Sequence, residues 1–238
     1  MYNINTSMDV YSYERVYMII YHGSEHIIEK PFYHGGRRNN DYGYGFYCTE
    51  YPNMAREWSA APDRIGILNS YEFEADSLSV LDLNEHSILT WLSVLLQNRV
   101  FQLNSPLARE AYSYLIEEFG IDYGSYDVIT GYRADDSYFS FAQDFINGTI
   151  SVTQLRQAMH LGNMGNQIVL ISRESYDHII YTGYEKVDSS IWYPKRKARD
   201  DKARKDYYSA DKNKYIRGDI YVTRIIDEGM KKEEVRLQ

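Results

Sequence analysis

Residues 30–45 constrain the fold most, because this stretch is dense in residues that interrupt regular structure. Its turn formers are Pro31, Gly35, Gly36, Asn39, Asn40, Gly43 and Gly45. Such a segment does not sustain a helix or strand, so we expect a long loop that comes close to a ligand. The apolar, β-branched and aromatic residues 16–21 before it predict a buried strand that leads into His22, Gly23 and Ser24.

Helix and strand patterns alternate along the rest of the chain. Helices are predicted at residues 52–61, after Asn84, at residues 106–120, after Asp135, Asp136 and Ser137, and from residue 152. Strands are predicted at residues 67–73 and 78–83, both in one sheet, and at residues 126–130 and 167–172. Asn84, Ser105 and Ser151 are the expected helix N-caps. With 238 residues, the chain suits one α+β domain, residues 1–238.

The C-terminal part has a different composition from the rest. Residues 195–214 mix Lys and Arg with Asp and lack Gly and Pro, which favours a solvated basic helix over a nucleic-acid or partner surface. Residues 219–226 predict a last strand, and residues 230–238 a frayed charged tail. We therefore divide the domain into a core, residues 16–185, and a charged extension, residues 186–238.

Charge and cysteine content narrow the class of protein. A formal net charge of -8 argues against a uniformly basic nucleic-acid binder, although a local basic patch stays open. Cys48 is the single cysteine, which excludes an internal disulfide and fits a reducing cytosol. We expect a cytoplasmic protein without membrane contact, since no basic region leads into an apolar run and no apolar run is long enough to span a bilayer.

Several familiar chemistries lack their motifs. The sequence has no phosphate-loop motif, no dinucleotide fingerprint after a first strand, no paired-His zinc helix and no serine in a Gly-flanked elbow. His26 and His34 lie near His22, but the carboxylates and spacing of a defined metal geometry are lacking, so no metal is predicted.

The segments 21–24 and 41–50, followed by Trp58, resemble an ADP-ribosyltransferase. In the His-Tyr-Glu branch, which includes the poly-ADP-ribose polymerases and diphtheria toxin, the similar positions bind NAD+. The NAD+-binding residues that the resemblance implies are Tyr21, His22, Gly23, Ser24, Gly43, Gly45, Tyr47 and Trp58. It also implies the fold: two packed, mainly antiparallel sheets with flanking helices and an NAD+ cleft.

The resemblance also assigns roles. His22 would bind a ribose hydroxyl, Gly23 and Ser24 the nicotinamide carboxamide, and Tyr47 with Trp58 would sandwich the nicotinamide ring. These roles agree with ordinary chemistry, because a neutral imidazole hydrogen-bonds hydroxyls and aromatic faces attract a flat cation. Arg37 and Arg38 are candidates for the pyrophosphate, or are simply exposed.

Gln167 is the departure from this pattern, because the resembled enzymes carry a glutamate at that strand start. Gln keeps the hydrogen bond to a ribose hydroxyl but loses the anion that stabilises an oxocarbenium-like charge. Asp135 and Asp136 are candidates to supply that charge or to deprotonate an acceptor, or else form a helix cap. The predicted catalytic residues are thus His22, Tyr47, Gln167, Asp135 and Asp136, and chain building of poly-ADP-ribose is not expected.

A second resemblance is to a bacterial family catalogued as domain of unknown function 3990, over residues 16–172. It rests on the His-Gly-Ser start, the Asp-aromatic-Gly-x-Gly-Phe-Tyr segment, residues 126–131, residues 134–136, and Asn166 with Gln167. Together the resemblances imply a mono-ADP-ribosyltransferase that uses NAD+ on a protein side chain or a nucleic acid. Bacterial relatives of this type are often toxins or defence effectors, which implies an antitoxin or other neutralising partner.

Two alternatives stay open. The fold persists as an NAD+ or ADP-ribose sensor if Gln167 does not support chemistry. The chain instead acts as an interaction protein if the basic helix, with Lys195, Arg196 and Lys197, holds a partner or nucleic acid.

Overall fold

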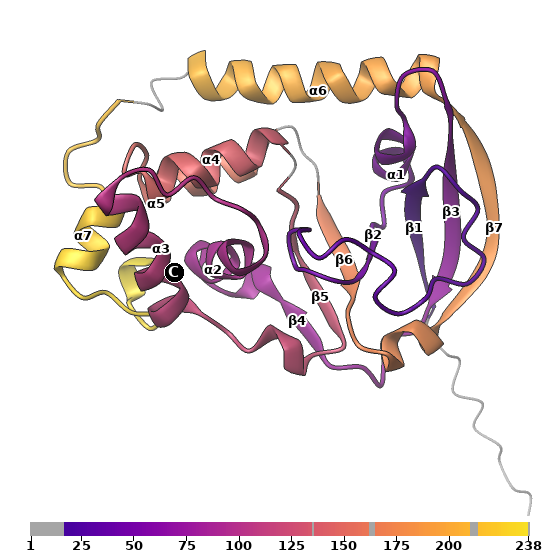
Figure 1. Ribbon diagram of the computed structural model, residues 1–238, viewed down its shortest axis with the longest axis horizontal. Coiled ribbons are helices and arrows are strands. Elements are labelled where there is room, and N and C mark those ends of the chain that lie inside the picture. Colours follow the sequence, from indigo (N-terminus) through magenta and orange to yellow (C-terminus); the bar gives the residue numbers. More distant parts are fainter. Residues whose placement is uncertain (1–16, 135, 162–164, 210–213, 238) are drawn as a thin grey trace, which may run out of the picture.

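The computed structural model describes residues 17–134, 136–161, 165–209 and 214–237, which form two β-sheets and a layer of helices (Figure 1). The strands are β1 Met18–Ser24, β2 Phe46–Cys48, β3 Ile65–Phe73, β4 Val80–Asp82, β5 Val128–Tyr132, β6 Asn166–Leu170 and β7 Ile179–Asp188. The α-helices are α1 Pro52–Ser59, α2 Ile88–Asn98, α3 Pro106–Phe119, α4 Asp136–Ile146, α5 Val152–Met159, α6 Ser189–Ser209 and α7 Val222–Asp227. Short 3-10 turns lie at Leu83–Glu85, Tyr123–Ser125, Glu174–His178 and Val235–Leu237.

The two sheets are mainly antiparallel, as predicted. The first has the strand order β1-β3-β7, and the second has the order β2-β6-β5-β4, in which only the β4–β5 pair is parallel. Strands β3 and β4 therefore lie in different sheets, whereas the sequence predicted one. A bridge between Tyr21 and Thr49, with N···O distances of 2.8 and 3.0 Å, joins β1 to the end of β2.

Two main apolar layers hold this arrangement together. Between the sheets, Ile20, Phe46, Tyr71 and Ile168 belong to one buried cluster that draws on β1, β2, β3 and β6. The helices α2, α3, α4, α5 and α7 pack on the other side of the second sheet around Trp91 in a larger cluster. Burial on this scale is the main favourable contribution to folding.

The predicted helix starts depended on local capping. Ser105 accepts a hydrogen bond from the Ala108 amide, and Ser151 forms a reciprocal capping box with Gln154, so both predictions are confirmed. The prediction for Asn84 is wrong, because that residue lies in a 3-10 turn and Ser87 caps α2 instead.

The C-terminal predictions need correction. The predicted last strand at residues 219–226 is wrong, because the helix α7 begins at Val222 within it. Val222 and Ile225 are three residues apart and both are buried against the helix layer. The predicted frayed tail is anchored, since Met230 and Leu237 are buried and the Ser87 hydroxyl donates to the Leu237 carbonyl at 2.7 Å. The predicted boundary after residue 185 falls within β7.

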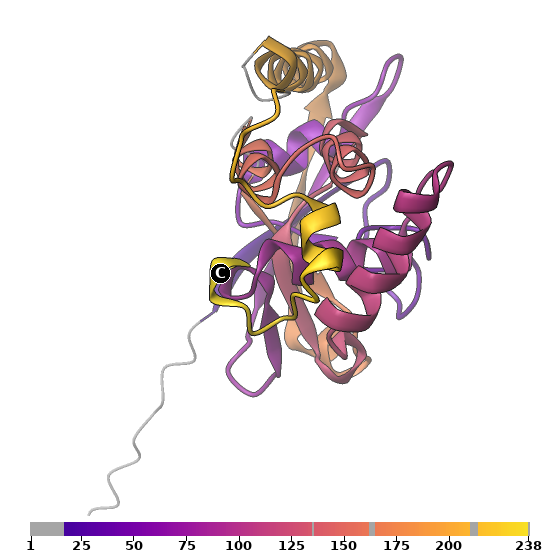
Figure 2. The ribbon, with the colours of Figure 1, turned by 90° about the vertical axis from the view of Figure 1, so that its left-hand side faces the viewer.

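Helix α6 spans the molecule above both halves (Figures 1 and 2). Near its middle, Arg199 pairs with Glu57 of α1 at 2.7 Å, and further along Tyr207 stacks on Phe141 of α4 with ring centroids 3.9 Å apart. The basic helix is therefore solvated on one side only and ties α1 to α4. No described helix has the length and apolar character needed to cross a bilayer.

Candidate functional site

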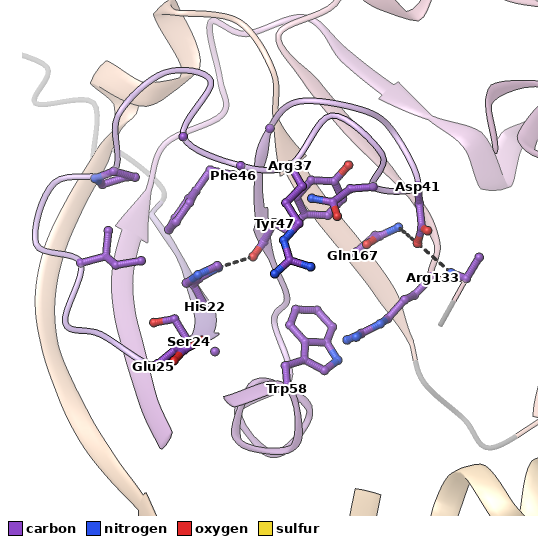
Figure 3. A pocket seen from close by; sticks show the side chains of 18 of the residues that line it. His22, Ser24, Glu25, Arg37, Asp41, Phe46, Tyr47, Trp58, Arg133 and Gln167 are labelled. Atoms are coloured by element: carbon purple, nitrogen blue, oxygen red, sulfur yellow. Dashed lines mark hydrogen bonds between the residues drawn. The ribbon is translucent and has the colours of Figure 1, made fainter. Parts of the chain in front are cut away.

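A cavity of about 690 Å³ lies where the end of β1, the glycine-rich loop, α1 and the start of β6 meet (Figure 3). Its lining includes His22, Gly23, Ser24, Gly45, Tyr47, Trp58 and Gln167. These residues come from distant parts of the sequence, and a volume of this size is typical of a small-molecule site. The structure therefore brings most of the predicted site residues together.

His22 is held in one tautomer by its partner. Its Nδ1 lies 2.7 Å from the Tyr47 carbonyl oxygen, and because a carbonyl only accepts, Nδ1 must carry the proton. Burial lowers the pKa of His22 below its usual value, opposed by this hydrogen bond, so the ring is neutral at pH 7. Phe46 stacks on the ring with centroids 4.5 Å apart. The Nε2 atom is thus an acceptor, suited to a hydroxyl donor.

Gly23 and Ser24 have structural partners as well as places in the pocket. A Cβ atom on Gly23 would lie 2.0 Å from the Ala55 carbonyl oxygen, so only glycine lets α1 pack this closely on β1. The Ser24 hydroxyl donates to the His26 carbonyl at 2.6 Å and accepts from the buried Asn69 amide at 3.0 Å. Asn69, which sequence reasoning missed, thereby shapes the turn after β1.

Tyr47 fixes the glycine-rich loop rather than presenting its hydroxyl to the cavity. That hydroxyl donates to the Gly43 carbonyl at 2.8 Å and accepts from the Tyr42 amide at 3.0 Å, while other atoms of Tyr47 line the cavity. Gly43 has φ of +76° and lines a different cavity. Gly45 lines this one and packs against Val169 of β6.

Trp58 lines the cavity, but Arg133 occupies one of its faces. The Arg133 guanidinium carbon lies 4.1 Å from the Trp58 ring centroid, and Arg37 extends from the loop toward the same ring (Figure 3). Sequence reasoning predicted that Tyr47 and Trp58 would sandwich a ligand ring, but it did not anticipate a cationic side chain on one face of Trp58.

Gln167 is buried and its side chain is fully oriented. Its Nε2 donates to the Asp41 carboxylate and to the Tyr132 carbonyl, both at 3.1 Å. Both amide hydrogens have acceptors, and the remaining polar atom of this side chain, Oε1, can only accept. An ionised glutamate could not make either of these two hydrogen bonds, because it has no donor.

Asp41 is a buried residue of the cavity lining that sequence reasoning missed. It lines the cavity at 6% exposure, and its carboxylate also accepts from the Ala134 amide at 2.8 Å and from Arg99 at 2.9 Å. Burial raises the pKa of Asp41, while these donors oppose the rise and favour the anion. The sequence signal that could have identified Asp41 is its position at the start of the Asp-aromatic-Gly segment.

The remaining predicted residues have other places. Tyr21 packs with Ala55, Leu68 and Val187, away from the cavity. Asp135 lies outside the described residues, and Asp136 is the first residue of α4. Arg133 and Ala134, just before them, line the cavity.

The cavity lining is cationic although the chain as a whole is acidic. Arg37, Arg64, Arg99, Arg133 and Arg196 line it together with three acidic residues, Glu25, Asp41 and Asp200. Arg64 pairs with Glu25 at 2.8 Å and Arg99 with Asp41, and no ion pair joins Arg37 to a described carboxylate. Such an excess of guanidinium groups favours an anionic ligand.

Among the described residues no group of three His, Cys, Asp or Glu side chains is placed to hold a metal ion.

The fold and this cavity define an α+β protein with a cationic pocket between its two sheets. The family described as protein of unknown function (DUF3990) matches residues 18–181, and the chain belongs to it. Comparisons with curated proteins and with solved structures gave no match. Arg196 and Asp200 of α6 lie outside the matched residues and still line the pocket.

Proposed function

We propose that the protein is a mono-ADP-ribosyltransferase whose substrate NAD+ binds in the cationic pocket. The observation that carries the proposal is the convergence of His22, Tyr47 and Gln167 in one cavity that Arg37 also lines. The order of these residues along the chain is that of the ADP-ribosyltransferases the sequence resembles.

The chemistry of each group supports this assignment. The His22 Nε2 and the Gln167 Oε1 are both acceptors, which suits the hydroxyls of two riboses. Arg37 suits the pyrophosphate, because guanidinium groups bind phosphate oxygens through charge-assisted hydrogen bonds. Trp58 offers an aromatic face for a flat ring.

In the proposed reaction the bond between the nicotinamide nitrogen and the ribose carbon breaks, and its electron pair leaves with nicotinamide. An acceptor nucleophile forms the new bond to that ribose carbon and gives up its proton. Positive charge grows on the ribose as the bond lengthens. The Asp41 carboxylate, hydrogen-bonded to Gln167, is the anion that we assign to stabilise this charge.

The first experiment incubates the purified full chain with radiolabelled NAD+ and a bacterial lysate, and measures free nicotinamide and labelled product. His22→Ala and Gln167→Ala should each lose at least tenfold in rate, whereas Tyr208→Ala, an exposed position on α6, should not change it. Protease and nuclease sensitivity of the label identify the acceptor. The proposal would be contradicted if the unaltered chain released no nicotinamide and gave no labelled product.

A second candidate function is an NAD+ or ADP-ribose sensor. It is favoured by one observation: Gln167 is uncharged, and the nearby Asp41 is already paired with Arg99. Saturable NAD+ binding by calorimetry without nicotinamide release would support the sensor instead. We propose that the protein, as transferase or as sensor, is a toxin or defence effector. Its expression should then arrest growth unless a neutralising partner is present.

A further inference from the structure

A second cavity of about 600 Å³ lies on the other side of the glycine-rich loop. Its rings come from the loop, from α3 and from the 3-10 turn after α3: they are Tyr33, His34, Tyr42, Tyr44, Tyr112 and Tyr123. The loop is therefore a wall between two cavities, with Arg37 on one side and Arg38 on the other, while Arg99 lines both.

Three loop rings form a continuous stack beside this cavity. The Tyr33 and His34 ring centroids are 3.9 Å apart, and those of His34 and Tyr44 are 4.9 Å apart. The Arg173 guanidinium covers Tyr33 at 5.1 Å from its centroid. At the opposite end Tyr44 is 42% exposed, so the stack ends on an accessible ring.

The backbone is strained to build this stack. His34 has φ of +63°, a left-handed conformation that is uncommon for residues other than glycine, and Gly35 follows it directly. Such conformations persist where the surroundings over-determine them, and they concentrate at binding sites. On the facing wall, the Asn98 amide donates to the Tyr123 hydroxyl at 3.0 Å and fixes that ring.

The charge of the cavity runs against that of the chain. None of the described residues that line it is Asp or Glu, although the chain carries a net charge of -8. Arg38 is exposed, and no ion pair joins it to a described carboxylate. Accessible rings beside an unpaired guanidinium group match the way proteins bind single-stranded nucleic acids, by stacking bases and pairing phosphates.

We infer that the second cavity binds a single-stranded nucleic acid segment, with a base on Tyr44 and a phosphate at Arg38. Binding of a single strand does not depend on the proposed function. Its consequence does rest on that function: the ADP-ribose acceptor is then a nucleic acid rather than a protein. The shared loop wall and shared Arg99 place a strand held here next to the NAD+ pocket.

The test measures fluorescence anisotropy of the full chain with labelled single-stranded RNA and DNA oligonucleotides and with a DNA duplex. We expect saturable binding to one or both single strands and weaker binding to the duplex. Tyr44→Ala should weaken binding fivefold or more, as the loss of one stacking ring predicts. Arg38→Gln should reduce the slope of log affinity against log salt by about 0.7, the value for one phosphate on a single strand.

Controls separate this inference from the proposed function. Tyr208→Ala and Arg217→Gln change an exposed tyrosine and an exposed arginine outside both cavities and should leave oligonucleotide binding unchanged. NAD+ binding measured by calorimetry should be unaffected by Tyr44→Ala. A failure of the NAD+ proposal and a failure of the oligonucleotide proposal can therefore be told apart.

Three outcomes would overturn the inference. The first is no saturable binding to single strands, and the second is binding that neither Tyr44→Ala nor Arg38→Gln alters. The third is competition by polyglutamate as strong as that by unlabelled oligonucleotide, which would show attraction by charge alone. If the label transferred from NAD+ resists nuclease and is removed by protease, the acceptor is a protein and the stated consequence fails.

Discussion

The two cavities on either side of the glycine-rich loop are built in opposite ways. In the cationic pocket the side chains of Asp41 and Gln167 are buried and hydrogen-bonded to each other. In the second cavity, exposed rings stack on one another and the charges are not matched by lining carboxylates. Buried networks fix the geometry of a site, whereas exposed stacking tolerates different bases. Changes in the first cavity should therefore affect stability strongly, and changes in the second mainly binding.

The largest effect is expected from Asp41→Ala. This change leaves Arg99, the Ala134 amide and the Gln167 amide without their shared acceptor, so we expect a loss of about 3 kcal/mol in the free energy of unfolding. Urea denaturation measures it. The matched control is Glu185→Ala, which removes an exposed partner of Arg56 and should cost less than about 1 kcal/mol. Equal losses in both variants would contradict the contrast between buried and exposed pairs.

Gln167→Glu should have the next largest effect. A glutamate there faces the Asp41 carboxylate across a contact that is now 3.1 Å long, and like charges at that distance cannot both ionise freely. We expect a loss of about 2 kcal/mol at pH 8 that shrinks as the pH falls and one carboxyl takes up a proton.

The double variant Asp41→Asn with Gln167→Glu sharpens this test. In this double variant the amide lies at position 41 and the carboxylate at position 167, so one side chain again donates and the other accepts. A double-mutant cycle should therefore give a coupling energy above about 1 kcal/mol. Simple additivity would show that the two side chains do not interact as described.

His22 should make stability depend on pH. Burial lowers its folded pKa, so below its usual pKa of 6.5 the unfolded chain binds a proton that the folded chain does not. Its contribution is thus lost as the pH falls below 6.5, with a slope approaching about 1.4 kcal/mol per pH unit. Urea unfolding between pH 7.5 and 5.5 should show a smaller loss for His22→Gln than for the unaltered chain. Parallel curves for the two proteins would show that His22 titrates alike in both states.

His34→Gly should change stability least. Glycine relieves the left-handed strain but removes two ring contacts, so we expect a net change within about 1 kcal/mol in urea denaturation. Oligonucleotide binding should nevertheless weaken several-fold, because Tyr44 loses the ring behind it. A large loss of stability would mean that the stack supports the fold rather than a ligand.

Sequence reasoning succeeded where structure depends on near neighbours. The caps at Ser105 and Ser151 and the strand before His22 are fixed by residues a few positions away. It failed at residues 219–226, where a β-branched run predicted a strand but burial of Val222 and Ile225 against the helix layer decided for a helix. Asn84 failed as a cap because Ser87 stands directly before the apolar run.

The candidate site shows the same division. His22, Tyr47, Trp58 and Gln167 carried a recognisable order along the chain, and all four line one cavity. The role of Asp41 depends on Arg99, Ala134 and Gln167, which lie 58, 93 and 126 residues away in the chain. Only the folded chain brings these partners together, and only then is the second cavity formed.

Strand β7 has a practical consequence for anyone who prepares a shortened protein. It runs from Ile179 to Asp188 and forms the outer edge of the first sheet, whereas the family match stops at residue 181. A fragment cut to the family boundary would keep the first three residues of that strand and leave the β3 backbone groups opposite the rest unpaired and open to other chains. Expression trials should therefore treat the family boundary as a limit of similarity and extend the chain through α6.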